Sequence, residues 1–314
     1  TVFTFAAILS VYLLGTAVGA TWFQRRLRNR PALGLLANLL TATATLAALG
    51  MATLPFARIA FDALRAVLGE SAPASFCTEL AIAALVFALP TIGMGAVFSL
   101  LVQRARDTGL GVGHALAWNT GGAALSGIVF GAGLLPVLGL KWSMAVAALG
   151  YLVLLPSISL RRLGRAAVPV LLVLLLPRDL GLVSLPAGEE IAEHREGLLA
   201  SVTVSAQTNG ARTLRVDSRF QMGSTAALLP QRRQAHLPLL LHPQPRRALF
   251  LGPGTGITLG AALEHPELRV EGVELVPEIV AVMPRFAPEN NDASHHPRAH
   301  VTVADARRFV RGTP

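Results

Sequence analysis

The stretch LFLGPGTGITLG at residues 249–260 decides the fold of the C-terminal half of the chain. A short apolar run leads into a turn with three glycines, and a second apolar run at helical spacing follows. This order predicts a strand, a glycine-rich turn and a helix, an arrangement that lets a backbone approach a nucleotide closely.

The glycine turn itself matches neither of the two common nucleotide motifs. Gly252, Gly254 and Gly256 form G-x-G-x-G, and Ile257 stands where the dinucleotide fingerprint has its third glycine. No Gly-Lys-Ser/Thr follows, so the phosphate-loop pattern is absent as well. The turn alone therefore predicts only an α/β ligand-binding loop.

Two acidic residues outside the turn narrow the ligand class. The segments 246–266, 268–286 and 299–310 each read as a strand followed by a helix or helix start, which predicts a parallel, doubly wound sheet. Glu274 ends the second strand, where a carboxylate accepts ribose hydroxyls, and Asp305 ends the third, where it meets an adenine amino group or caps a helix. A ligand with ribose and adenine but no phosphate fits, such as S-adenosylmethionine or its decarboxylated form.

The N-terminal half has a different composition. The chain is 53% hydrophobic and only 14% charged, and the apolar runs lie within residues 1–177. We expect three parts: a transmembrane helical bundle (1–180), a β-rich element (187–245) and a Rossmann-like nucleoside-binding domain (246–314). In the β-rich element, alternating residues on both sides of Asn209-Gly210 predict a hairpin.

Five apolar runs are long enough to span a membrane, and a sixth is short. The runs are 1–23, 32–54, 76–103, 114–139 and 141–160, followed by 166–177. Arginine clusters at 24–30, 103–106 and 161–165 fall in alternate loops and predict that this side is cytoplasmic. Segment 55–70 has amphipathic spacing and is expected along the opposite interface.

Within the fourth run, Gly127 and Gly131 stand four residues apart, which permits close helix packing. Asn119 and Thr120 are expected to face the bundle. The net charge of +9 comes from arginines placed between apolar runs, so nucleic acid is not an expected partner. The single cysteine, Cys77, leaves no cysteine-based metal site, and no metal is expected.

With these motifs in place, the chain resembles the spermidine synthase (polyamine aminopropyltransferase) family, and especially membrane proteins that fuse a major-facilitator-like bundle to a spermidine synthase-like domain. The resemblance covers essentially the whole chain, and four segments carry it: AWNTGGAALSGIVFGAGLLPVLG (117–139), the domain entry at 217–266, VEGVELVPE (270–278) and VADARRFV (303–310).

The resemblance implies a class I methyltransferase-like domain that transfers an aminopropyl group from decarboxylated S-adenosylmethionine to an amine. The matching cosubstrate positions are Gly252, Gly254, Thr255, Gly256, Glu274, Asp305 and Ala306. Gln221 matches the glutamine that lines the family's active site, and His236 is a second candidate for substrate binding. The family's catalytic Asp follows the fourth strand, which would lie after Pro314, so we expect a fragment that lacks both ends.

Two departures from the family pattern concern the acceptor. Thr255 replaces the Asp of the family's glycine loop, and Pro230, Gln231 and Arg232 stand where the family has Tyr-His-Glu. A diamine needs carboxylates or aromatic faces around its ammonium groups, whereas Arg232 and Arg233 are cationic.

Three functions therefore stay open: a membrane-bound aminopropyltransferase, an S-adenosylmethionine-dependent methyltransferase with a non-cationic acceptor, and a non-catalytic transporter or sensor that binds a nucleoside. The expected partners are membrane lipid, a small-molecule amine acceptor and a second copy of the chain. The expected location is the bacterial inner membrane, with the soluble domain in the cytoplasm.

Overall fold

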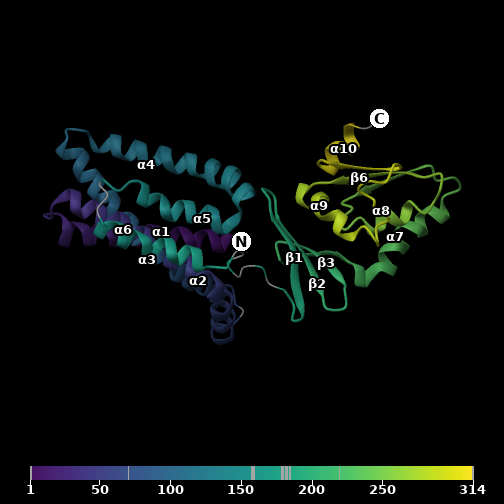
Figure 1. The fold of residues 1–314 in the computed structure, drawn as a ribbon, viewed down its shortest axis with the longest axis horizontal. Coiled ribbons are helices and arrows are strands. Elements are labelled where there is room, and N and C mark those ends of the chain that lie inside the picture. Colours follow the sequence, from purple (N-terminus) through teal and green to yellow (C-terminus); the bar gives the residue numbers. More distant parts are fainter. Residues whose placement is uncertain are drawn as a thin grey trace. The chain divides into compact units, whose positions relative to one another are not determined.

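The computed structural model describes residues 2–69, 71–156, 160–177, 180, 183, 185–218 and 220–312. The chain divides into two compact units, Thr1–Leu182 and Val183–Pro314. The first unit is helical and the second combines two sheets with short helices (Figure 1).

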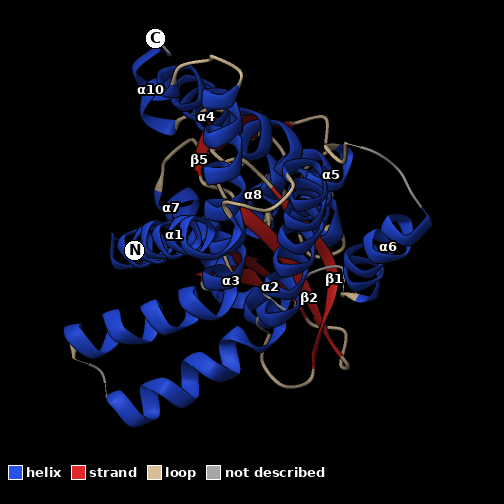
Figure 2. Ribbon diagram, turned by 90° about the vertical axis from the view of Figure 1, so that its left-hand side faces the viewer, coloured by secondary structure: helices blue, strands red, loops and turns tan. Residues whose placement is uncertain are grey.

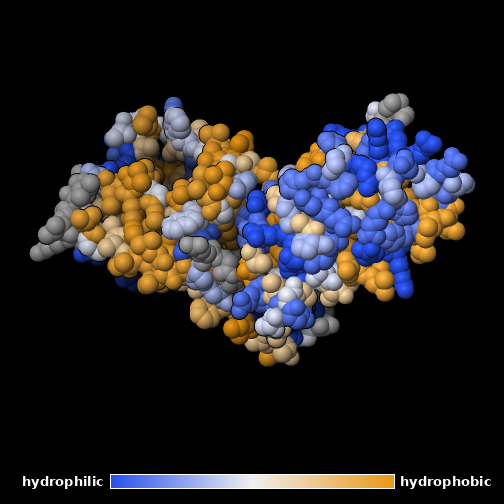
Figure 3. Space-filling view, turned by 45° about the vertical axis from the view of Figure 1, so that its right-hand side comes forward, coloured by the Kyte–Doolittle hydropathy of each residue, from blue (hydrophilic) through white to orange (hydrophobic). Residues whose placement is uncertain are grey.

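The helical unit contains six α-helices and two π-helical stretches in its described part. They are α1 (Val2–Trp22), η1 (Phe23–Leu27), α2 (Ala32–Leu68), α3 (Ala72–Asp107), α4 (Val112–Ser126), η2 (Gly127–Leu134), α5 (Leu135–Val153) and α6 (Leu160–Leu175). Four helical stretches are long and apolar enough to cross a membrane: Thr4–Leu27, Gly34–Leu68, Ala72–Asp107 and Val112–Val153. Figure 3 shows hydrophobic residues gathered over the surface of this unit.

The fourth and fifth expected spans form one continuous helical stretch, Val112–Val153. Its 42 residues would measure about 63 Å if straight, twice the thickness of a hydrocarbon layer. Gly139 interrupts the stretch with a non-helical backbone (φ 74°, ψ 172°). The kink at this glycine lies next to the predicted break between the two spans.

Segment 55–70 was expected to be amphipathic and to lie along the opposite interface; its described part is helical, and the interfacial position stays a prediction. Helix α2 continues without a break to Leu68, with Pro55 inside it, and pairs with α3 as a long helical hairpin (Figure 2). A proline removes one backbone hydrogen bond, which an apolar helix tolerates without ending. The sixth run forms α6, which is too short to be counted with the four long stretches.

Two hydrogen bonds hold the three arginine-rich segments at one end of the helical unit. The Gln103 side chain at the end of α3 donates to the carbonyl of Arg28, 3.4 Å away. The Arg165 guanidinium in α6 donates to the side-chain oxygen of Asn38 near the start of α2, at 3.1 Å. The basic segments therefore share one side, as their alternate positions along the chain predict.

Helices α1 and α3 approach each other closely at two glycines. A Cβ on Gly15 would lie 1.9 Å from the Thr91 hydroxyl oxygen, and one on Gly19 would lie 2.0 Å from the Ile92 carbonyl oxygen. In contrast, Gly127 and Gly131 have no described atom within 4 Å of such a Cβ. The sequence pattern predicted close packing at the wrong glycine pair, because spacing alone does not show which helix faces a neighbour.

Gly19→Val is expected to destabilise the helical unit by about 1–3 kcal/mol, because the added methyl groups must push α1 away from backbone atoms of α3. Gly131→Val is the matched control, with the same change at open space, and should leave stability within about 0.5 kcal/mol of the parent. Thermal unfolding of the full chain in detergent measures both. Equal losses in the two variants would contradict the α1–α3 packing.

The second unit contains two sheets. The antiparallel sheet has the order β1 (Glu189–Glu196), β2 (Ser201–Gln207), β3 (Arg212–Val216) and β4 (Phe220–Ser224). The parallel sheet has the order β5 (Arg247–Leu251), β6 (Arg269–Glu274) and β7 (Ala299–Val303). The remaining elements are η3 (Thr225–Ala227), α7 (Leu228–Leu241), α8 (Ile257–Ala262), α9 (Pro277–Val282), η4 (Met283–Phe286) and α10 (Ala306–Gly312).

The predicted hairpin is confirmed. Strands β2 and β3 pair antiparallel, and Gly210 takes a positive φ of 84° in the turn between them. The inner face of this sheet packs against α9 and η4 through Val202, Val204 and Leu214. This core joins the antiparallel sheet to the parallel one and fixes β4 beside the glycine turn.

A buried carboxylate ties β1 to β3. Both oxygens of Glu189 accept hydrogen bonds from the Arg215 guanidinium at 3.0 Å, and Ser205 and Gln207 donate as well. Burial raises the pKa of the Glu189 carboxyl, but the hydrogen bonds from Ser205 and Arg215 outweigh it, so the pKa lies below its ordinary value.

A depressed pKa makes this sheet sensitive to acid. The charged form of Glu189 contributes stability above its unfolded pKa of about 4.3, and that contribution is lost as the pH falls through the lower folded value. When the pH is lowered below about 4.3, we expect the urea concentration at the unfolding midpoint of the second unit to fall. The fall should be smaller in Glu189→Gln. The exposed neighbour change Glu190→Gln should keep the parent pH profile. An unchanged profile in Glu189→Gln would refute the assignment.

Candidate nucleoside site at the glycine turn

The glycine turn lies at the carboxyl end of β5, between that strand and α8. Gly252, Gly254 and Gly256 all have positive φ, at 73°, 56° and 75°. This backbone conformation is costly for residues with a Cβ, so the three glycines are required by the turn itself. At Gly256 a Cβ would also lie 2.9 Å from the Met283 sulfur.

Glu274 ends β6 and holds the turn from the neighbouring strand. Its side chain is buried, and the backbone N–H of Gly254 donates to Oε2 at 3.4 Å. The N–H groups of Leu275 and Val276 donate to Oε1 at 2.8 and 3.3 Å. These three donors occupy much of the accepting capacity of the carboxylate, and the long bond from Gly254 is the weakest of them.

Asp305 follows β7 at the same edge of the parallel sheet. Its side chain is exposed, and Oδ1 accepts the N–H of Arg308 at 3.0 Å, which caps α10. Ala306 begins that helix. The backbone N–H of Ala304 donates to the carbonyl of Glu274 at 3.0 Å, which keeps the ends of β6 and β7 together.

Thr255 is buried in the turn and points toward the antiparallel sheet. Its hydroxyl donates to Oε1 of Gln231 at 3.1 Å, and the Gln231 amide donates to the carbonyls of Ser224 and Ala227 at 2.7 and 2.8 Å. A Cβ on Gly223 would lie 2.8 Å from the Thr255 methyl group. A neutral Thr–Gln pair therefore couples the glycine turn to α7 and β4.

A cavity of about 550 Å³ opens beside this pair, between the end of β4, α7 and the glycine turn. Gln221, Gln231, Gln234 and Thr258 contribute polar side chains to its wall, and Gly252 contributes backbone. No charged side chain is part of the wall formed by the described residues. The structure thus brings Gln221 to the glycine turn, whereas Glu274, Asp305 and Ala306 are not part of this wall.

His236 is not part of the wall of the 550 Å³ cavity, and its role in substrate binding stays a prediction. Its Nδ1 lies 3.1 Å from Nε2 of His265, and its Nε2 lies 3.5 Å from a carboxylate oxygen of Glu264. The same carboxylate pairs with Arg232 at 2.5 Å. His236 and Arg232 therefore belong to a polar cluster between α7 and α8, and neither is part of the wall of the 550 Å³ cavity. The cationic side chain of Arg232 is turned away from that cavity.

Asn290 was missed by the sequence analysis. It is fully buried, and its amide donates to the carbonyls of Thr255 and Met283 at 2.9 and 3.1 Å. It stands in the polar run PENNDASHH at 288–296, which reads as an ordinary loop. The buried position of one asparagine in such a run depends on tertiary packing, so no local signal distinguishes it.

Comparison with known proteins finds similarity to polyamine aminopropyltransferases and spermidine synthases. Over 100 residues, the chain is 31% identical to a polyamine aminopropyltransferase of Desulforudis audaxviator, which covers 32% of this chain and 36% of that protein. A polyamine aminopropyltransferase of Aquifex aeolicus is 32% identical over 101 residues, again 32% of this chain and 36% of the relative. The spermidine synthase of Dictyostelium discoideum is 25% identical over 126 residues, 39% of this chain and 44% of the relative.

The chain spans less than half the length of these relatives. Among solved structures, the spermidine synthase of Thermotoga maritima aligns over 38% of this chain and 43% of its own, with a TM-score of 0.36 and 20% identity. A second match has the same values and is a spermidine synthase in complex with the transition state analogue AdoDATO. No family model matches the chain.

Proposed function

We propose that the chain is a membrane-bound, spermidine synthase-like aminopropyltransferase that uses decarboxylated S-adenosylmethionine and an amine acceptor. One observation carries the proposal: the buried carboxylate of Glu274 holds a turn of three glycines with left-handed backbone, and the first of them, Gly252, lines a cavity together with Gln221. Sequence similarity to polyamine aminopropyltransferases supports the reaction type.

In this reaction the acceptor nitrogen attacks the aminopropyl carbon next to the sulfonium. A carbon–nitrogen bond forms, the carbon–sulfur bond breaks, and methylthioadenosine leaves with the electron pair on sulfur. The new ammonium then loses a proton to a base. The described residues contribute binding and orientation, through Glu274 for the ribose, Asp305 and Ala306 for adenine, and Gln221 for the acceptor. The resemblance to the family implies that the base is an Asp that follows the fourth strand of the parallel sheet, the strand after β7.

A specific observation favours a second candidate. Gln231 lines the cavity and accepts a hydrogen bond from Thr255, and no charged side chain is part of the described wall. A diammonium acceptor is normally held by carboxylates or aromatic faces. A methyl transfer from S-adenosylmethionine to an uncharged acceptor suits this lining and is the alternative to test.

The decisive experiment incubates the full chain with either cosubstrate and a panel of amines, and identifies the nucleoside product by mass spectrometry. Methylthioadenosine that appears only with decarboxylated S-adenosylmethionine and an amine supports aminopropyl transfer. S-adenosylhomocysteine from S-adenosylmethionine supports methyl transfer and contradicts the first proposal. Binding of either nucleoside without any product supports the sensor or transporter alternative.

The membrane part of the proposal rests on the four long apolar helical stretches and on the arginines at one end of the unit. We propose that the helices lie in the bacterial inner membrane, with the soluble unit and the arginine-rich end on the cytoplasmic side. Resistance to carbonate extraction tests the insertion. Protease digestion of oriented vesicles tests the side, and cleavage of the soluble unit from the periplasmic face would exclude the proposed orientation.

A further inference from the structure

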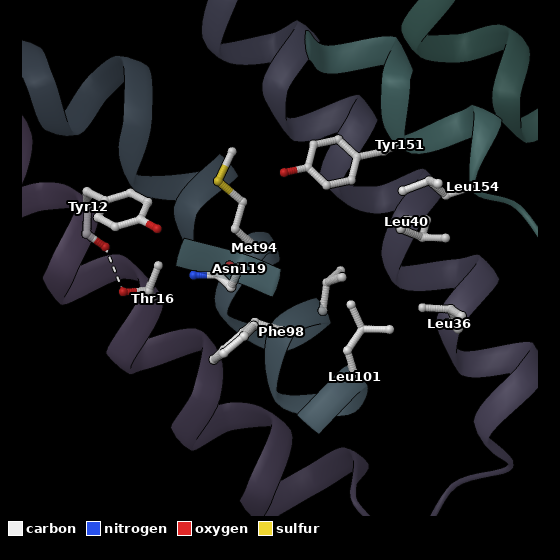
Figure 4. A pocket seen from close by; sticks show the side chains of 11 residues that line it. Tyr12, Thr16, Leu36, Leu40, Met94, Phe98, Leu101, Asn119, Tyr151 and Leu154 are labelled. Atoms are coloured by element: carbon white, nitrogen blue, oxygen red, sulfur yellow. Dashed lines mark hydrogen bonds between the residues drawn. The ribbon is translucent and has the colours of Figure 1, made fainter. Parts of the chain in front are cut away.

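A cavity of about 710 Å³ lies between α1, α2, α3, α4 and α5 of the helical unit, and two of its polar lining residues, Tyr12 and Asn119, are exposed. This volume lies within the range of sites that hold drug-sized ligands. Most of the wall is hydrocarbon, as Met94, Phe98 and Leu101 illustrate (Figure 4). The cavity belongs to the part of the molecule that the transfer reaction does not use.

Four polar side chains interrupt the apolar wall: Tyr12, Thr16, Asn119 and Tyr151 (Figure 4). The Thr16 hydroxyl donates to carbonyls of its own helix, at 2.9 Å to Tyr12 and 3.0 Å to Leu13. The Asn119 amide and the two tyrosine hydroxyls make no side-chain hydrogen bond within the part of the chain that the structure describes. In a hydrocarbon environment such groups are costly unless a partner satisfies them.

The charge of the wall limits what that partner can be. No acidic or basic side chain is among the described residues that line the cavity. A polyamine carries several ammonium groups and would lose its hydration without gaining a counter-ion, which is strongly unfavourable. A phospholipid with an anionic head group would also lose its hydration, and the wall offers no cation to compensate the charge. A neutral amphiphile meets both requirements, because its chains match the apolar wall and its head matches the amide and hydroxyls.

We infer that this cavity binds a neutral lipid of the diacylglycerol type, with the ester and hydroxyl oxygens of its head at Asn119, Tyr12 and Tyr151 and its acyl chains along α2 and α3. The inference assumes that the helical unit lies in a membrane, and it adds to the proposed reaction a lipid-binding role for the helices. Asn119 is the principal recognition residue, since its amide both donates and accepts hydrogen bonds.

The test uses the full chain in nanodiscs and a diacylglycerol with a photoreactive diazirine in one acyl chain. Mass spectrometry of peptides is expected to find the label on the cavity wall, with Met94 and Phe98 as the nearest targets. Tyr151→Phe and Asn119→Leu each remove hydrogen bonds, worth about 0.5–1.5 kcal/mol apiece, so labelling should fall about twofold to tenfold. Trp118→Phe, an exposed neighbour outside the cavity wall, is the control and should label as the parent does.

Three results would overturn the inference. Labelling that is equal in the Asn119 and Trp118 variants would indicate general contact with the bilayer. Stronger labelling by a spermidine probe with the same diazirine, competed by free spermidine, would make the cavity a polyamine site. No label on the cavity wall in a chain that resists carbonate extraction would show that the cavity is closed to lipid. Transferase assays use a different readout, so either proposal can fail without the other.

Discussion

Glu274→Gln is expected to weaken binding of decarboxylated S-adenosylmethionine by about tenfold to a hundredfold. The carboxylate accepts N–H bonds from Gly254, Leu275 and Val276, and hydrogen bonds to a charged group are worth about 1.5–3 kcal/mol. A glutamine offers one accepting oxygen in place of two. The amide nitrogen of the glutamine would face a backbone N–H donor, so at least one buried donor would have no acceptor. The glycine turn would then be held less firmly.

The matched control for this change is Glu271→Gln on the same strand. Glu271 pairs with Arg247 on the surface, at 3.2 Å, and has no contact with the glycine turn among the described interactions. Isothermal titration with methylthioadenosine and with decarboxylated S-adenosylmethionine measures both variants. Glu271→Gln should bind as the parent does. If Glu274→Gln also binds within threefold of the parent, the ribose site does not lie at the end of β6.

The local sequence pattern of the second unit was enough to predict much of its fold. The order of apolar run, three glycines and second apolar run predicted a turn between a strand and a helix, and Gly252, Gly254 and Gly256 take left-handed backbone in that turn. The Asn209-Gly210 hairpin and the parallel pairing of β5, β6 and β7 follow from turn chemistry and from the alternation of strands and helices. These features depend on residues that are close together in the sequence, so they can be predicted from the sequence of one chain.

The contacts of the site were less predictable, because they join residues far apart in sequence. His236 was expected near substrate, but it lies 3.1 Å from His265 in a polar cluster between α7 and α8. Asn290 was overlooked, although its amide holds the glycine turn from 35 residues away. The assignment of Glu274 and Asp305 to ribose and adenine stays a prediction, which the Glu274 variant begins to test.

In the helical unit, hydropathy indicated the number of apolar runs but not their partners. Spacing favoured Gly127 and Gly131 for close packing, whereas α1 and α3 approach each other at Gly15 and Gly19. Asn119 is part of the wall of the 710 Å³ cavity, but it is exposed, and no described residue of α4 is buried. Composition determines which segments are apolar, and only the three-dimensional arrangement determines which faces meet.

Gly260→Ala is expected to destabilise the second unit by about 2 kcal/mol, despite the better helix propensity of alanine. A Cβ at this position in α8 would lie 1.9 Å from the carbonyl oxygen of Asn290 and 2.3 Å from its carbonyl carbon. Both are backbone atoms, which cannot move aside as a flexible side chain can. Overpacking of this kind costs about 1–3 kcal/mol, and a clash with backbone atoms belongs at the upper end of this range. The gain of about 1 kcal/mol in helix propensity offsets only part of that cost.

The loss of stability should come with a loss of nucleoside binding, because displacement of Asn290 also breaks its bonds to Thr255 and Met283 and releases the glycine turn. Gly312→Ala in α10 is the control, since a Cβ there has no described atom within 4 Å. Pulse proteolysis in urea measures the stability of the second unit within the full chain. Titration with methylthioadenosine measures nucleoside binding at the glycine turn. A Gly260→Ala variant that keeps both would show that α8 does not pack against the Asn290 backbone. A variant that loses stability but binds normally at low urea would separate the packing role of Asn290 from its hold on the glycine turn.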